Sequence, residues 1–145
     1  MLKAMLDLFK ESSDNDQETH TVELATATLF SEIIRADRDI QQAELDTYRE
    51  KLAAQFGLSD HELDTLMQEG QEMAEDAVDF VQFTQVINEK CSNEQKITIL
   101  KGLWQVAYAD NEIAPIEEHT VRRIADLLYI PHSQFIKTKL DVTGE

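Results

Sequence analysis

The chain contains few of the residues that interrupt helices. Of its 145 residues, only four are glycine and two are proline. These are the residue types that helix interiors tolerate least, so their scarcity favours helix. Hydrophobic residues make up 42% of the chain, which is enough for the core of one domain. No apolar run approaches the roughly 20 residues that cross a bilayer, so we do not expect an integral membrane protein.

Cysteine is nearly absent, and basic residues are outnumbered. The single cysteine, Cys91, excludes an internal disulfide and a thiolate metal cluster, which is typical of a cytoplasmic protein. Lys and Arg number 13 against 29 Asp and Glu, giving a net charge of −16. A polyanion cannot gain affinity by displacing counterions from nucleic acid, so we expect no nucleic-acid partner. This charge favours cationic proteins and divalent cations instead.

The sequence also lacks the residue spacings that mark common active sites. Its four histidines form no His-Glu-x-x-His or Glu-x-x-His pattern, which argues against zinc hydrolase and di-iron chemistry. Four glycines leave no glycine-rich loop that could hold a phosphate group. We therefore predict that the protein is not an enzyme.

Helical periodicity runs through residues 21–145. Apolar residues recur at spacings of three and four, as in the stripe Val22, Ala25, Leu29 and Ile33. Ser59 with Glu62, and Ser92 with Gln95, match the capping box that opens a helix. Gly57 suits the left-handed position after a helix, and Pro115 suits a first helical position. We predict an all-α, single-domain bundle of about seven helices.

Residues 1–20 have a different pattern from the rest. "MLKAMLDLFK" predicts a short amphipathic helix with Leu2, Met5, Leu6 and Phe9 on one face, followed by a polar, acidic linker. Its apolar face would dock onto the protein's own core or onto a partner. Peripheral contact with a membrane is the alternative, although only two lysines flank that face.

The chain repeats itself. "ADRDIQQAE", Ala36–Glu44, aligns with "ADNEIAPIE", Ala109–Glu117, and both read Ala-Asp-x-[Asp/Glu]-Ile-x-x-x-Glu. Downstream, after a one-residue deletion, "GLSDHEL" aligns with "YIPHSQF". We predict two pseudo-symmetric helix-loop-helix repeats, at about 21–75 and 93–140, joined by a connecting helix at about 79–90. Stacked on each other, they would bury one core and form a single domain over 21–145.

The two acidic loops allow two interpretations. Each supplies three carboxylates, and hard cations such as Ca²⁺ or Mg²⁺ prefer oxygen ligands. The candidate metal ligands are Asp37, Asp39 and Glu44 in the first loop, and Asp110, Glu112 and Glu117 in the second. Neither loop has the frame of an EF-hand.

In the structural interpretation, Glu44 and Glu117 lie in the first turn of a helix and accept hydrogen bonds from its free backbone N–H groups. Asp37 and Asp110 would fold across each loop to accept from the backbone of the next helix. Ile40 and Ile113 would then enter the core. The two interpretations are compatible, and both stay open at this point.

These motifs resemble a known family. "LWQVAYADNEIAPIEEHTVRRIADLLYIPHSQF", residues 103–135, resembles the TerB-like superfamily, which includes tellurite-resistance proteins and the N-terminal domain of a membrane-anchored DnaJ-type co-chaperone. The resemblance covers about residues 21–140. The glycine of the family's loop is replaced by Arg38 in the first copy and Asn111 in the second. Asparagine tolerates a left-handed backbone better than arginine does.

The resemblance implies a cytoplasmic, non-enzymatic binding module in stress or tellurite-resistance physiology. It would bind a protein partner, and its acidic loops would weakly bind a divalent cation, with no other cofactor expected. The alternative is an adaptor that its N-terminal helix recruits to a membrane or partner, with the acidic loops purely structural.

Overall fold

The computed structural model describes residues 22–36, 40–77 and 79–144, and the regular structure of these residues is entirely helical. The helices span residues 22–35, α2 (Gln42–Phe56), α3 (Asp60–Asp76), α4 (Val81–Lys90), α5 (Asn93–Ala107), α6 (Pro115–Leu127) and α7 (His132–Thr143). They confirm the predicted all-α fold. The helix predicted within residues 1–20 lies outside the described residues, and so do Asp37, Arg38 and Asp39.

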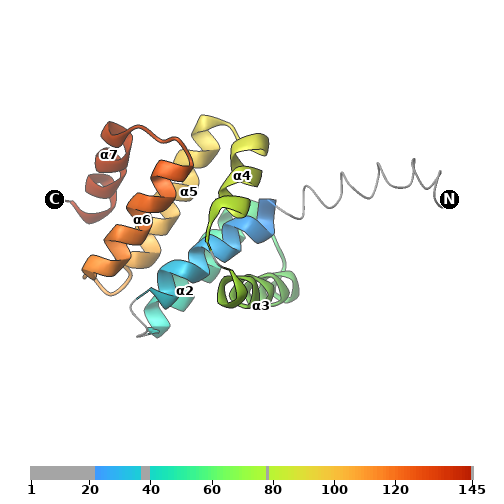
Figure 1. Cartoon of the computed structure of the whole chain (residues 1–145). Helices are drawn as coiled ribbons and strands as arrows, with labels where there is room; N and C mark the ends of the chain where they lie inside the picture. Colours follow the sequence, from blue (N-terminus) through green and yellow to red (C-terminus); the bar gives the residue numbers. More distant parts are fainter. Residues whose placement is uncertain (1–21, 37–39, 78, 145) are drawn as a thin grey trace, which may run out of the picture.

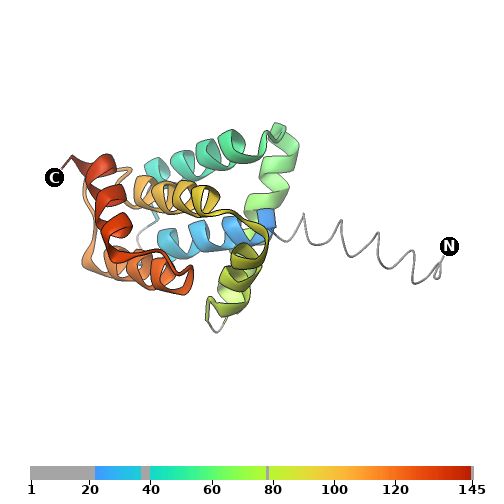
Figure 2. The same cartoon turned by 90° about the horizontal axis from the view of Figure 1, so that it is seen from above.

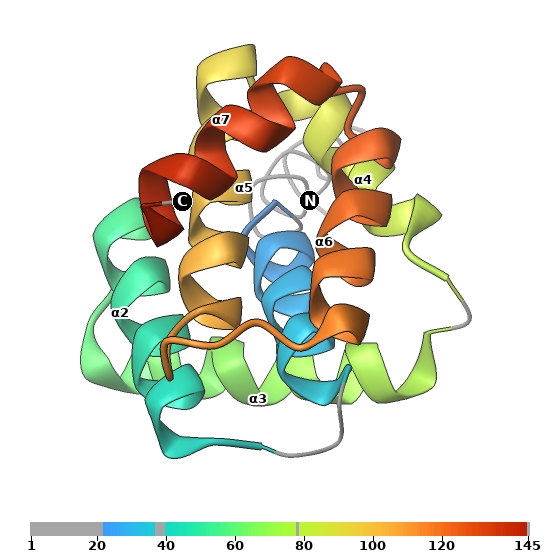
Figure 3. The same ribbon diagram turned by 90° about the vertical axis from the view of Figure 1, so that its left-hand side faces the viewer.

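Helix 22–35 lies at the centre of the bundle, between α5 and α6 and above α3 in the view of Figure 3. Every residue from 25 to 31 is buried, so the helix is enclosed on all sides and not along one stripe only. Two of its buried hydroxyls are satisfied within the helix. Those of Thr26 and Thr28 donate to the carbonyl oxygens of Val22 and Leu24, four residues earlier.

The other helices divide between the two ends of the molecule. Helices α5, α6 and α7 lie together at one end in Figures 1 and 2, and α5 packs against both of the others and against α2. Helix α3 lies at the opposite end and crosses helix 22–35 and α2 (Figure 3). The crossing is close at Gly70, where an added Cβ would lie 2.9 Å from the Ala27 Cβ and from the Tyr48 hydroxyl oxygen.

The local signals read from the sequence are confirmed where they can be checked. The Ser59 hydroxyl accepts from the Glu62 backbone N–H, and the Glu62 carboxylate accepts from that of Ser59. The same exchange joins Ser92 and Gln95 at the start of α5. Gly57 ends α2 with a φ of +63°, and Pro115 is the first residue of α6.

Two predictions about organisation have different outcomes. Helix α4, Val81–Lys90, corresponds to the connecting helix that we placed at 79–90. The pseudo-symmetry of the two repeats stays a prediction, although individual equivalent positions can be compared. In the part of the chain that is described, none of the helices combines the length and the apolar composition that a bilayer span requires.

Candidate functional site

The second acidic loop, residues 108–114, turns sharply between α5 and α6. Asn111 has a φ of +69°, as its tolerance of the left-handed region allows, and its N–H donates to the Tyr108 carbonyl oxygen at 2.9 Å. The Asp110 carboxylate accepts from the Glu112 backbone N–H at 3.2 Å. That donor belongs to the loop itself, so Asp110 closes a local turn and does not cap α6 as we predicted.

Glu117 has the structural role that the sequence predicted. Its side chain is 2% exposed in the first turn of α6, and one carboxylate oxygen accepts from the Ala114 backbone N–H at 2.9 Å. Glu44 does the same in α2, where it is also 2% exposed and accepts from the Gln41 N–H at 3.2 Å. The two repeat-equivalent glutamates therefore cap their helices in the same way.

The isoleucines of the two loops differ. Ile113 is half-buried and packs against the core, as predicted. Ile40, its counterpart in the first copy, is 58% exposed, so the prediction that it enters the core is wrong. The two copies therefore differ at this isoleucine position.

The candidate metal ligands of the second loop have different surroundings. Asp110 and Glu112 are exposed, whereas Glu117 is buried and bonded to the backbone. Among residues 22–36, 40–77 and 79–144, no group of three or more His, Cys, Asp or Glu side chains is arranged to hold a metal ion. Cation binding stays a prediction, and the first-loop ligands Asp37 and Asp39 lie outside the described residues.

An ion pair that the sequence did not predict lies beside this loop. The Lys139 ammonium of α7 is 3.3 Å from the Glu118 carboxylate of α6, and both residues line a hollow of about 330 Å³ next to Asn111. Tyr108 lines the same hollow, whereas Trp104, one turn earlier in α5, is completely buried. Trp104 is therefore a core residue, and Tyr108 lines a groove.

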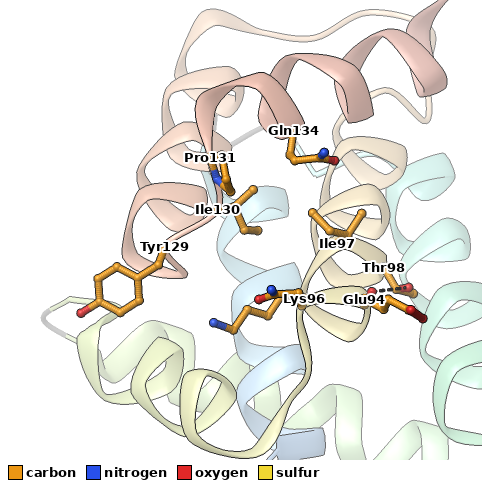
Figure 4. Close-up of a pocket in the computed structure, with 9 residues that line it drawn as sticks. Glu94, Lys96, Ile97, Thr98, Tyr129, Ile130, Pro131 and Gln134 are labelled. Atoms are coloured by element: carbon orange, nitrogen blue, oxygen red, sulfur yellow. Dashed lines mark hydrogen bonds between the residues drawn. The ribbon is translucent and has the colours of Figure 1, made fainter.

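A larger groove of about 660 Å³ lies between the start of α5 and the turn that leads into α7 (Figure 4). We call it the Tyr129 groove. In Figure 4, Ile97 and Ile130 face each other across it, and Gln134 approaches from α7. The remaining lining residues are Asn93, Glu94, Lys96, Thr98, Tyr129 and Pro131.

Tyr129 has an unusual backbone for an aromatic residue. Its φ is +59°, and its side chain is 79% exposed. The turn is held by the Ile130 N–H, which donates to the Ala125 carbonyl oxygen at 3.0 Å, and by the Lys96 ammonium, which donates to the Leu128 carbonyl oxygen at 3.2 Å. For a residue other than glycine, a left-handed backbone costs on the order of 1 kcal/mol.

The alignment of the two repeats contained the signal that predicts a left-handed backbone at Tyr129. The alignment of "GLSDHEL" with "YIPHSQF" pairs Gly57 with Tyr129, and both residues have a left-handed backbone, at φ +63° and +59°. The first copy fills the position with the residue that suits it best. The second copy carries an exposed aromatic ring there, and the N–H groups of Tyr129 and Ile130 donate to the Asp126 and Ala125 carbonyl oxygens and so end α6 in this conformation.

The family model of the tellurite resistance protein TerB matches residues 23–140. The chain belongs to the TerB family. The match spans both acidic loops, all of α2 to α6 and most of α7, so the TerB-like resemblance read from residues 103–135 is confirmed. Searches among curated proteins and among solved structures found no match.

Proposed function

We propose that this TerB-family chain is a non-catalytic, cytoplasmic binding module that engages a cationic protein partner. Tellurite resistance or a related stress response is the physiological setting that the family's description suggests. The observation that carries the proposal is the uneven distribution of charge. Residues 90–145 contain seven Lys and Arg against eight Asp and Glu, whereas residues 1–89 contain six against twenty-one.

The acidic charge is concentrated on α3. This helix carries seven carboxylates and no lysine or arginine, and six of the seven are exposed. Arg49 of α2 pairs with Asp60 and Asp64 at the start of the helix. Glu72, Glu75 and Asp76 extend the acidic face towards its end. Such a face attracts a cationic partner over a distance of about 8–10 Å at physiological ionic strength.

A groove beside α3 offers apolar surface next to these carboxylates. It has a volume of about 290 Å³ and is lined by Glu23, Leu58, His61, Glu62, Thr65, Leu66 and Glu69. Hydrogen bonds from the backbone and the hydroxyl of Ser59 lower the pKa of Glu62, so this carboxylate is charged at neutral pH. Lysine and arginine suit these surroundings because their aliphatic stems pack on apolar surface while their charged ends reach a carboxylate.

A labelled peptide of alternating lysine and leucine tests this proposal. We expect it to bind the full chain, and binding to weaken at least five-fold between 50 and 300 mM salt, because exposed charges are screened. Glu72→Lys with Glu75→Lys should weaken binding at least ten-fold. Fluorescence anisotropy measures both effects.

The control for that experiment is Asp126→Lys with Asp141→Lys. Both of these residues are exposed, on α6 and α7, and the double change alters the net charge by the same amount at the other end of the molecule. Equal loss in the two double variants would mean that the peptide responds to net charge only, and the proposed surface would be wrong.

Weak binding of Ca²⁺ or Mg²⁺ at the second acidic loop is a second candidate function, supported by the exposed Asp110 and Glu112. At a cation concentration of five times Kd, we expect stabilisation of about 1 kcal/mol, or about 3 °C in melting temperature. Asp110→Asn with Glu117→Gln should abolish this rise. Thermal unfolding with each ion at millimolar concentration checks it, and an unchanged melting temperature with every ion rejects the candidate.

A further inference from the structure

We propose that the Tyr129 groove binds an extended, uncharged, apolar peptide segment of a partner protein. This site is separate from the acidic face of α3, and the two can be tested independently. Three properties of the groove carry the proposal: its floor, its polar groups and the exposed aromatic residue at its edge.

The floor of the groove is apolar and open. Ile97 of α5 is half-buried, and Ile130 is 7% exposed, so part of each side chain is available to a ligand. Pro131 continues this surface to the start of α7. A volume of about 660 Å³ accommodates several apolar side chains of a peptide.

Two amides at the groove can bind a peptide backbone. Asn93 begins α5 and Gln134 lies in the first turn of α7, and both side chains are exposed. Within the described part of the chain, neither side-chain amide makes a hydrogen bond. An amide offers both a donor and an acceptor, which is what the N–H and C=O groups of an extended peptide require.

Tyr129 places an exposed aromatic ring at the edge of the groove. Its ring projects from one end of the groove in Figure 4, and the Lys96 ammonium lies 6.0 Å from the ring centre. An exposed aromatic ring supplies a large apolar area with little side-chain freedom to lose, and such rings are common anchors of interfaces.

Charge decides what kind of segment the groove accepts. The nearby residues Glu94 and Lys96 balance each other, and residues 90–145 as a whole are almost neutral. A polycation is therefore directed to α3 and not to this groove. A second copy of the chain is disfavoured because each copy carries a net charge of −16, and the two would repel each other.

Phage display of random 12-residue peptides on the full chain tests the proposal. We expect enriched peptides to share one or two large apolar residues, to carry little net charge and to bind with a Kd in the micromolar range. Tyr129→Gly should weaken them at least ten-fold and Gln134→Ala at least three-fold. Glu72→Lys with Glu75→Lys, on the acidic face, should leave their affinity unchanged.

The same Tyr129→Gly variant has a second readout that separates lost binding from lost folding. Because glycine suits the left-handed backbone, we expect the melting temperature to rise by about 2–5 °C while binding is lost. A variant that is more stable but binds less cannot be explained by damage to the fold.

Several results would overturn the proposal. One is the absence of enriched peptides, and another is equal binding to wild type and Tyr129→Gly. Enriched peptides that are polycationic and lose affinity in Glu72→Lys with Glu75→Lys would assign the binding to α3. A synthetic peptide of residues 1–12 of this chain that displaces the selected peptides at equal concentration would identify its own N-terminal segment as the occupant.

Discussion

Replacing Trp104 with alanine is expected to lower the free energy of unfolding by about 3–5 kcal/mol, the usual cost of removing a fully buried aromatic side chain. Trp104 is 0% exposed in α5, and its ring centre is 5.1 Å from that of Phe135 in α7. The change therefore empties the centre of the contact that holds α7 on α5. Urea unfolding followed by circular dichroism measures the loss.

Trp104→Phe should cost much less, about 1–2 kcal/mol. Phenylalanine keeps a ring against Phe135, and it removes the buried indole N–H, which finds no acceptor among the described residues. Removing a buried donor that has no acceptor stabilises the folded state, and this gain offsets part of the stability lost with the ring's packing. Tyr108→Ala, one turn further along the chain, just after α5, and half-exposed, is the matched control and should cost no more than about 1 kcal/mol. If Trp104→Phe and Trp104→Ala cost the same, the indole N–H has a stabilising partner.

Replacing Gly70 with alanine is expected to cost about 2 kcal/mol, although alanine favours a helix by about 1 kcal/mol. The added Cβ would lie 2.9 Å from the Tyr48 hydroxyl oxygen and 3.0 Å from the Ala27 carbonyl carbon, which is backbone and cannot move aside by itself. Either α3 shifts away from helix 22–35, or Tyr48 leaves its place. Each response breaks packing that is present in the wild type.

The Gly70→Ala substitution is costly because the Tyr48 hydroxyl, which it would displace, makes two hydrogen bonds. It donates to the Ala27 carbonyl oxygen at 2.9 Å and lies 2.8 Å from the Ser31 hydroxyl. Burial raises the pKa of Tyr48 far above its usual value, so the hydroxyl keeps its proton and stays a donor.

The neighbouring Gln71→Ala variant controls for helix propensity because Gln71 is exposed. Its free energy of unfolding should change by less than about 0.5 kcal/mol. Thermal unfolding compares the two variants. A Gly70→Ala protein as stable as Gln71→Ala would mean that α3 does not press on helix 22–35.

Predictions from sequence succeeded where the cause is local. The capping pairs, the left-handed Gly57 and the position of Pro115 depend on residues within about four positions of each other, so a single stretch of sequence contains the whole interaction. Glu117 belongs to the same class, because its acceptor role is fixed by its distance from the start of α6.

Predictions failed or were absent where distant segments meet. The periodicity of apolar residues predicted that helix 22–35 is buried along one stripe. The helix is buried on its other faces too, because three other helices place Tyr48, Gly70 and Gly102 against it. Lys139 is far from Glu118 in sequence and meets it only because α7 packs beside α6. The Tyr129 groove also forms from two distant segments, and of its features only the pairing of Tyr129 with Gly57 could be read from the chain.

The enclosed position of helix 22–35 also has a consequence for synthesis of the chain. Its Phe30 packs against Gly102 of α5, which is added some 70 residues later. At translation rates of about 5–20 residues per second, the apolar helix waits about 4–14 s for its partner. During that interval its surface can bind chaperones or other nascent chains. A ribosome that stalls between α4 and α5 would therefore leave an aggregation-prone fragment.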